Sequence, residues 1–162
     1  MWATSSTCSN KKAIMENIKL LEFDEIKVGE IAKHSFHFTQ EKVAIFSELV
    51  QDFAPVHCQE DFAKEQGFSK RIVHGFFVSS IFSGMLGTQI PGPKTVINTC
   101  NFKMHNPVLI GDQVDYEIKV ASTSNAVKVI VLELKATNQK GEIILSGKSM
   151  CSFPSKISHG KN

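Results

Sequence analysis

Two side chains suited to acid–base chemistry, Asp52 and His57, stand on either side of Pro55. A histidine is half-protonated near neutral pH, and an aspartate can orient it or activate a water molecule itself. The proline stiffens the backbone between them, and the residue ahead of a proline is pushed out of the helical region. We therefore expect both residues on a loop, as a candidate pair for adding or removing water. The alternative is a turn aspartate that caps local amides, beside a surface histidine.

Gly75 is the second candidate, because it follows His74 and opens an apolar run that extends to about Gln89. If the run is a helix, the Gly75 N–H points out of its N-terminus, where the helix dipole favours negative charge. Such a donor can stabilise the enolate oxygen of a thioester. The alternative is that Gly75 only lets the chain enter the helix, since glycine is an acceptable N-cap.

Ser83 is the third candidate, and it lies eight residues after Gly75, two turns into the apolar run. A buried hydroxyl needs a partner, and a bond back to the carbonyl one turn earlier is the default. The competing reading is that Ser83 bonds the catalytic loop lying across the helix. Ser79 and Ser80 are chemically similar, so residue type does not separate the three serines.

The elements that must hold these residues follow from periodicity. Alternation predicts a half-buried strand over Ile31 to Phe38, and Thr39 is a plausible N-cap for a helix that stops before Pro55. A short helix is expected over Glu60 to Glu65. The apolar run from Gly75 is predicted to be a core helix, because Pro91-Gly92-Pro93 ends it short of the roughly 20 residues that span a bilayer.

The rest of the chain predicts strands with turn residues between them. They are expected over Thr95 to Met104, Gln113 to Ser122, Ala126 to Ala136 and Glu142 to Phe153. Consecutive strands with short joints pair antiparallel. The fold class is therefore α+β, a single domain over residues 21–155 in which a long antiparallel sheet wraps a central buried helix.

Composition excludes several classes of protein. The chain has 162 residues, 18 basic and 16 acidic, a net charge of +2, and no basic cluster that suits nucleic acid. Four cysteines lie far apart without zinc spacing, which indicates free thiols in a reducing, cytoplasmic compartment. Residues 1–20 are expected to be a poorly ordered extension and 156–162 a tail. The extension has no apolar signal-peptide core, and its lack of arginine makes a mitochondrial presequence only a weak alternative.

No metal site is expected. His34 and His37 stand three apart on a predicted strand and so face opposite sides of it. Cys58 neighbours His57, and neighbours on an extended loop diverge, which argues against a cysteine–histidine nucleophile pair. His105 is interpreted as a strand-end residue.

These motifs, in this order, resemble the MaoC-like (R)-specific enoyl-CoA hydratases of the hot-dog fold. The family signature runs Asp-x-Asn-Pro-aliphatic-His, then aliphatic-x-His-Gly, a helix with Ser-Gly and Leu-Gly, Pro-Gly, and Pro-x-x-x-Gly-Asp. The matching segments here are Asp52 to His57, Ile72 to Gly75, Phe82 to Gly87, Pro91-Gly92 and Pro107 to Asp112. The resemblance covers about Leu21 to Phe153, and several motifs in order are far more specific than any one of them.

The resemblance implies that Asp52 and His57 activate water for addition to a trans-2-enoyl-CoA, giving an (R)-3-hydroxyacyl-CoA. The Gly75 N–H would hold the thioester oxygen, Ser83 would support the acid–base pair, and His74 and Ala54 would lie against the substrate. It also implies a homodimer and no metal or organic cofactor. Ala54 departs from the family, which has Asn there. The alternatives are a 3-hydroxyacyl-ACP dehydratase, a hot-dog thioesterase, or a catalytically weakened acyl-CoA-binding protein.

Overall fold

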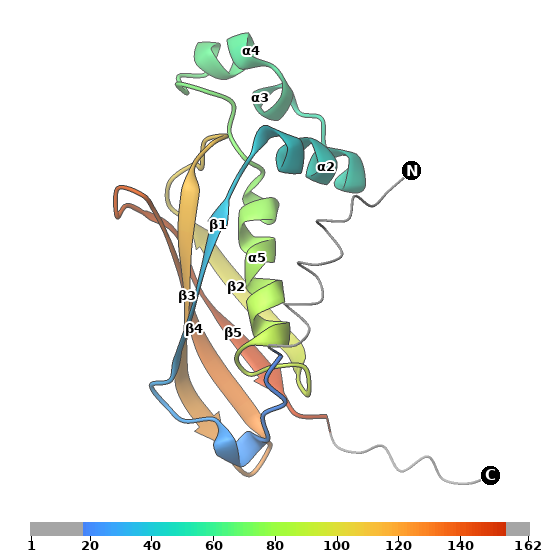
Figure 1. Ribbon diagram of the computed structural model, residues 1–162, viewed down its shortest axis with the longest axis vertical. Helices are drawn as coiled ribbons and strands as arrows, with labels where there is room; N and C mark the ends of the chain where they lie inside the picture. Colours follow the sequence, from blue (N-terminus) through green and yellow to red (C-terminus); the bar gives the residue numbers. More distant parts are fainter. Residues whose placement is uncertain (1–17, 155–162) are drawn as a thin grey trace, which may run out of the picture.

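Five antiparallel strands and one long helix dominate the described chain, which runs from residue 18 to residue 154 in this computed structural model (Figure 1). Residues 1–17 and 155–162 lie outside the described residues, and the predicted N-terminal extension and C-terminal tail fall largely on them. The elements in chain order are η1 (Phe23–Glu25), β1 (Ile31–His37), α2 (Gln40–Val50), α3 (Pro55–Cys58), α4 (Glu60–Glu65), α5 (Gly75–Thr88), β2 (Val96–Met104), β3 (Gln113–Ser124), β4 (Val129–Asn138) and β5 (Ile143–Ser152).

The strands form a single sheet in the order β1-β3-β4-β5-β2, and every neighbouring pair is antiparallel. β3, β4 and β5 pair consecutively as predicted. The expectation that β2 pairs with β3 is wrong, because β2 pairs with β5 at the opposite edge. The chain between β2 and β3 makes no hairpin, since Val73 donates to the Val108 carbonyl at 2.8 Å and Ile72 bridges to Leu109. This connection therefore supports the segment that enters α5.

The central strands alternate buried and exposed side chains, as a sheet with one covered face requires. The residues that point into the core are Val114, Tyr116, Ile118 and Val120 of β3 and Ile130, Leu132, Leu134 and Ala136 of β4. Gly147 of β5 faces β2, where an added Cβ would collide with the carbonyl oxygen of Asn101. Glycine is therefore required at this position, where β5 approaches β2 closely.

The turn between β3 and β4 lies further along the chain than predicted. β3 ends at Ser124 rather than Ser122, β4 begins at Val129 rather than Ala126, and residues 125–128 form the turn. Lys128 has a positive φ of 49° there, and its ammonium group donates to the Asn125 side chain at 2.6 Å.

α5 lies against the concave face of the sheet and supplies the central rod of the fold (Figure 1). Its inner face packs through Val78, Phe82, Met85 and Leu86, and the Val78 carbonyl accepts a hydrogen bond from the Tyr116 hydroxyl at 3.0 Å. The prediction of a central core helix is confirmed, and within a single chain the helix is buried only on the side that faces the sheet. Its outer face is exposed, and 83% of Phe76 is accessible. No helix within residues 18–154 has the length and apolar character needed to cross a membrane.

α2, α3 and α4 gather at the end of the molecule where α5 begins (Figure 1). α2 starts as predicted, with the Thr39 hydroxyl accepting from the Lys42 N–H at 3.4 Å. It ends at Gln51, which adopts a left-handed conformation with φ 58°. The expectation that His57 lies on a loop is wrong, because Pro55 begins the short helix α3. Proline suits the first helical position, where its missing N–H has no intrahelical acceptor and its φ is preset.

Candidate active site

Asp52 follows α2 and is held by its own backbone. Its N–H donates to the Ser47 carbonyl at 3.1 Å, which closes the end of α2. Its Oδ1 accepts from the Ala54 N–H at 3.1 Å, a turn typical of aspartate. Oδ2 makes no hydrogen bond to any part of the described chain, and 48% of the side chain is exposed. Asp52 therefore presents one carboxylate oxygen that is free to take a proton.

His57 is fixed by one strong contact from its ring. Nδ1 lies 2.8 Å from the Ile72 carbonyl, which only accepts hydrogen bonds, so Nδ1 carries a proton and donates it. In the neutral ring the lone pair is then on Nε2, which has no partner among the described residues. The segment that enters α5 thus sets the tautomer of His57 and leaves Nε2 available to a substrate or a water molecule.

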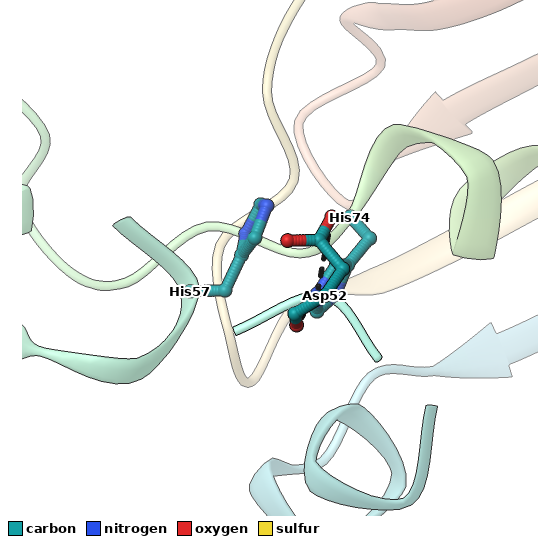
Figure 2. A group of neighbouring side chains, drawn as sticks. All are labelled: Asp52, His57 and His74. Carbon is teal, nitrogen blue, oxygen red and sulfur yellow. Dashed lines mark hydrogen bonds and ion pairs between the residues drawn. The ribbon is translucent and has the colours of Figure 1, made fainter. Parts of the chain in front are cut away.

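Asp52, His57 and His74 meet where α5 begins (Figure 2). Each offers a nitrogen or carboxylate oxygen, and these three atoms lie within 4.8 Å of one another. A single water molecule can touch two groups at that separation, since each hydrogen bond to it spans about 2.8 Å. The structure thus brings together the two residues that the sequence singled out as a pair.

His74 is the buried member of the group, with 3% of its surface accessible. Its Nε2 lies 3.1 Å from the Asp52 carbonyl and 3.3 Å from the Ser47 hydroxyl. Its ring stacks on His57 with centroids 3.8 Å apart. Burial is the main cause that lowers the pKa of His74 below its usual value, with the neighbouring His57 acting in the same direction, so the ring stays neutral near pH 7. Sequence reasoning missed Ser47, because a serine inside a helix carries no signal that it faces a site.

Gly75 is the first residue of α5, and its N–H has no acceptor within residues 18–154. A Cβ at this position would make only ordinary contact with Met104, 3.6 Å from its terminal methyl. Packing therefore does not require glycine here. Beside Gly75 lies a pocket of about 220 Å³ whose lining is mostly apolar and includes Val78, Met104 and Pro107.

Ser83 is not brought to this group within one chain. It is exposed on the outer face of α5, about 12 Å along the helix axis from Gly75 at a rise of 1.5 Å per residue. The premise that its hydroxyl is buried is wrong, and its supporting role stays a prediction. Ser79 and Ser80 donate to the carbonyls of Phe76 and Phe77 at 3.0 Å and 2.8 Å.

The distances among the three side chains of the site would permit a metal ion, but the orientation of the two rings does not favour one. The two imidazole rings are nearly parallel, with 28° between their planes. The lone pair of each ring lies in its own plane, so stacked rings direct their lone pairs side by side rather than toward one point. Two further ring nitrogens, Nδ1 of His57 and Nε2 of His74, already face carbonyl oxygens. This arrangement suits proton transfer better than metal coordination.

A curved antiparallel sheet around one long helix defines a hot-dog protein, and an acid and two imidazoles lie at the start of that helix. Residues 25–141 match the family model described as "MaoC like domain", and the chain belongs to that family. Its relatives are named hydratases and dehydratases, which makes it a hydro-lyase.

Individual relatives agree with this assignment. The chain is 32% identical over 129 residues to an (R)-specific enoyl-CoA hydratase of Aeromonas caviae, covering 80% of this chain and 96% of the relative. It is 28% identical over 139 residues to a mitochondrial 3-hydroxyacyl-[acyl-carrier-protein] dehydratase of Solanum lycopersicum, covering 85% and 83%. The solved structure of the (R)-hydratase from A. caviae involved in PHA biosynthesis superposes with a TM-score of 0.77 at 32% identity, covering 80% of this chain and 98% of that one.

Proposed function

We propose that this protein catalyses the reversible, (R)-specific hydration of trans-2-enoyl-CoA to (R)-3-hydroxyacyl-CoA. The observation that carries the proposal is that groups without hydrogen-bond partners gather at the start of α5. A carboxylate oxygen of Asp52 and a ring nitrogen of His57 lie within 4.8 Å of one another, and Asp52 Oδ2, His57 Nε2 and the Gly75 N–H have no partner among the described residues. The similarity to the A. caviae hydratase supports the substrate class and the stereochemistry.

In the proposed reaction, Asp52 and His57 hold one water molecule against C3 of the enoyl thioester. As the water oxygen bonds to C3, one of its protons passes to this pair, and the C2=C3 electrons move toward the thioester carbonyl. The Gly75 N–H stabilises the charge that develops on that oxygen. The pair then delivers a proton to C2, so the water is added without net gain or loss of protons by the enzyme. Dehydration follows the same steps in reverse.

The first experiment follows the loss of enoyl absorbance of crotonyl-CoA. We expect turnover by the wild type and a fall of about 10² to 10⁴-fold in Asp52→Asn and in His57→Gln, the usual worth of a positioned acid or base. Both variants keep the size of the native side chain, so folding should be preserved and is checked by circular dichroism. Full activity in either variant would refute the site.

We propose that the reaction needs no metal or organic cofactor. The stacked geometry of His57 and His74 supports this, since their free lone pairs do not converge. Dialysis against EDTA should leave the hydration rate unchanged, and added zinc should not raise it. A loss of rate on chelation that zinc restores would contradict this proposal.

The functional unit is proposed to be a homodimer that joins its sheets through β2. β1 and β2 are the two edges of the sheet. The β1 edge exposes one large apolar side chain, Ile31, and carries Lys33 paired with Glu117, whereas β2 exposes three, Val96, Ile97 and Met104. Exposed edge strands with apolar side chains invite pairing with another chain.

Sedimentation velocity tests the dimer. The wild type should sediment as a dimer at micromolar concentration, and Ile97→Lys should sediment as a monomer. The control is Ile31→Lys, the equivalent change on the β1 edge, which should stay dimeric. A monomeric wild type, or identical behaviour of the two variants, would contradict an interface through β2.

A carrier-protein substrate is the second candidate, and the similarity to the S. lycopersicum dehydratase favours it. Comparing kcat/KM for crotonyl-CoA and for crotonyl-ACP separates the two. Binding of CoA esters without turnover of either would instead support the acyl-CoA-binding protein that Ala54 suggested.

The S. lycopersicum dehydratase is mitochondrial by name. Imaging of a C-terminally tagged chain therefore tests the predicted cytoplasmic location against a mitochondrial one.

A further inference from the structure

His74 is placed to control Asp52 rather than to meet the substrate. It is 3% exposed and lies between α2, the Asp52 segment and the start of α5. The Phe46 ring lies 5.3 Å from its own, centroid to centroid, and the His57 ring stacks at 3.8 Å. The imidazole is therefore clamped by its neighbours and has little freedom to turn.

The contacts of His74 define which nitrogen carries its proton. The Asp52 carbonyl, 3.1 Å from Nε2, only accepts hydrogen bonds, so Nε2 must donate. The Asp52 carboxylate oxygen Oδ2 is 3.9 Å from the same nitrogen, too far for a direct hydrogen bond. His74 thus holds the backbone of Asp52 and leaves its reactive oxygen free.

A purely structural role explains this arrangement poorly. Nδ1 of His74 is buried and has no hydrogen-bond partner in the described chain. A buried acceptor without a partner lowers stability, and an apolar side chain of similar size would avoid that loss. Buried polar groups without partners call for an explanation, and a functional one is available here because the donor on the opposite side of the ring reaches Asp52.

We propose that His74 is a positioning residue, which aims the Asp52 carboxylate through the Asp52 carbonyl and fixes the plane of His57 by stacking. The proposal rests on the proposed hydration and names how its acid–base pair is held. Ser47 assists, because its carbonyl accepts from the Asp52 N–H at 3.1 Å and its hydroxyl lies 3.3 Å from His74 Nε2. Asp52 is thereby gripped at both its N–H and its carbonyl.

Two variants of His74 separate positioning from packing. His74→Gln keeps a side-chain N–H near the position of Nε2, whereas His74→Leu fills the space without a donor. A displacement of about 1 Å in a catalytic group can cost 10²-fold in rate. We expect kcat for crotonyl-CoA to fall about 10²-fold in His74→Leu with KM within twofold of the wild type, and to stay within about fivefold in His74→Gln.

Thermal denaturation of the same variants shows whether a loss of kcat is accompanied by a loss of stability. His74→Leu should unfold at a temperature close to that of the wild type, because the removal of the unpaired acceptor Nδ1 offsets the loss of the Nε2 contacts with the Ser47 hydroxyl and the Asp52 carbonyl. Loss of kcat without loss of stability cannot come from a merely structural residue. Unchanged kcat in His74→Leu, or an equal loss in His74→Gln, would overturn the proposal.

Crystal structures of the two variants keep this test separate from that of the proposed function. An inactive wild type would refute the hydration, whereas the placement of Asp52 would still decide the role of His74. We expect the Asp52 carboxylate to shift in His74→Leu and to keep its position in His74→Gln. An Asp52 that stays in place in both structures would overturn the positioning role, whatever the wild type catalyses.

Discussion

The central strands and the segment 51–75 treat their polar groups in opposite ways. In β3, β4 and β5 the backbone groups pair in long ladders that one irregularity interrupts in each pairing, and side chains such as Ile118 and Leu132 are fully buried. In segment 51–75 several strong donors and acceptors have no hydrogen-bond partner among residues 18–154, including the Gly75 N–H and Asp52 Oδ2. The sheet uses its hydrogen bonds for stability, whereas the segment keeps some of its own available for a ligand.

This contrast divides the molecule into a part that sets stability and a part that sets rate. Substitutions in the sheet should change the free energy of unfolding and leave the rate per folded molecule intact. Substitutions in segment 51–75 should do the reverse. Each prediction below either breaks this division or makes it sharper.

Apart from substitutions of Asp52 and His57 themselves, the largest effect is expected at Gly75. Gly75→Pro replaces the N–H by a ring carbon with little backbone strain, since proline suits the first position of a helix and His74, at ψ 129°, already has the conformation that precedes proline. Losing one oxyanion donor costs about 10²–10³ in kcat. The control is Gly75→Ala, which keeps the N–H and should be much more active in the crotonyl-CoA assay. Equal activity of the two variants would show that the Gly75 N–H does not contribute to catalysis.

The next effect belongs to the sheet. Leu132 of β4 is fully buried, and Leu132→Ala should lower the free energy of unfolding by about 2–5 kcal/mol through lost burial and the cavity it leaves. Urea denaturation measures this change. Turnover per folded molecule should match that of the wild type, and a large drop in kcat at low temperature would break the division.

A smaller effect is expected from acid, through His74. Burial lowers the pKa of His74 below its usual 6.5, so below that pH the unfolded chain binds more protons at this residue than the folded chain does. The free energy of unfolding should therefore fall as the pH drops below about 6.5, and this contribution should be fully lost at the lower folded-state pKa. His74→Gln should show a shallower fall in urea denaturation across the same range. Identical slopes would mean that His74 titrates normally.

The smallest expected effect is an increase in the hydration rate, in Ala54→Asn. Ala54 stands where the family has Asn, and its N–H already orients Asp52. Ala54→Asn would restore one side-chain hydrogen bond of about 1 kcal/mol, which is roughly fivefold in rate if it acts in the transition state. The crotonyl-CoA assay measures the gain. A slower Ala54→Asn variant would mean that this chain holds its water in another way.

Much of this architecture could be predicted from the sequence, because local chemistry determines it. The Thr39 cap, the short helix over Glu60–Glu65, the Gly75 start of α5 and the Asp52–His57 pairing all follow from residue types and spacing. The β2–β5 pairing could not be predicted, since it depends on contacts between the 105–112 connection and the entry to α5. The exposure of Ser83 could not be predicted either, because the sequence of an all-apolar helix does not indicate which of its faces the sheet covers.

A double-substitution cycle on Asp52 and His57 tests most directly whether both act on one water molecule. The measurement is kcat/KM for crotonyl-CoA in Asp52→Asn, His57→Gln and the double variant. Groups that act as a unit are not additive, so the double variant should be about as slow as the slower single variant. Losses that multiply in the double variant would mean that the two residues act independently, and would contradict a shared water.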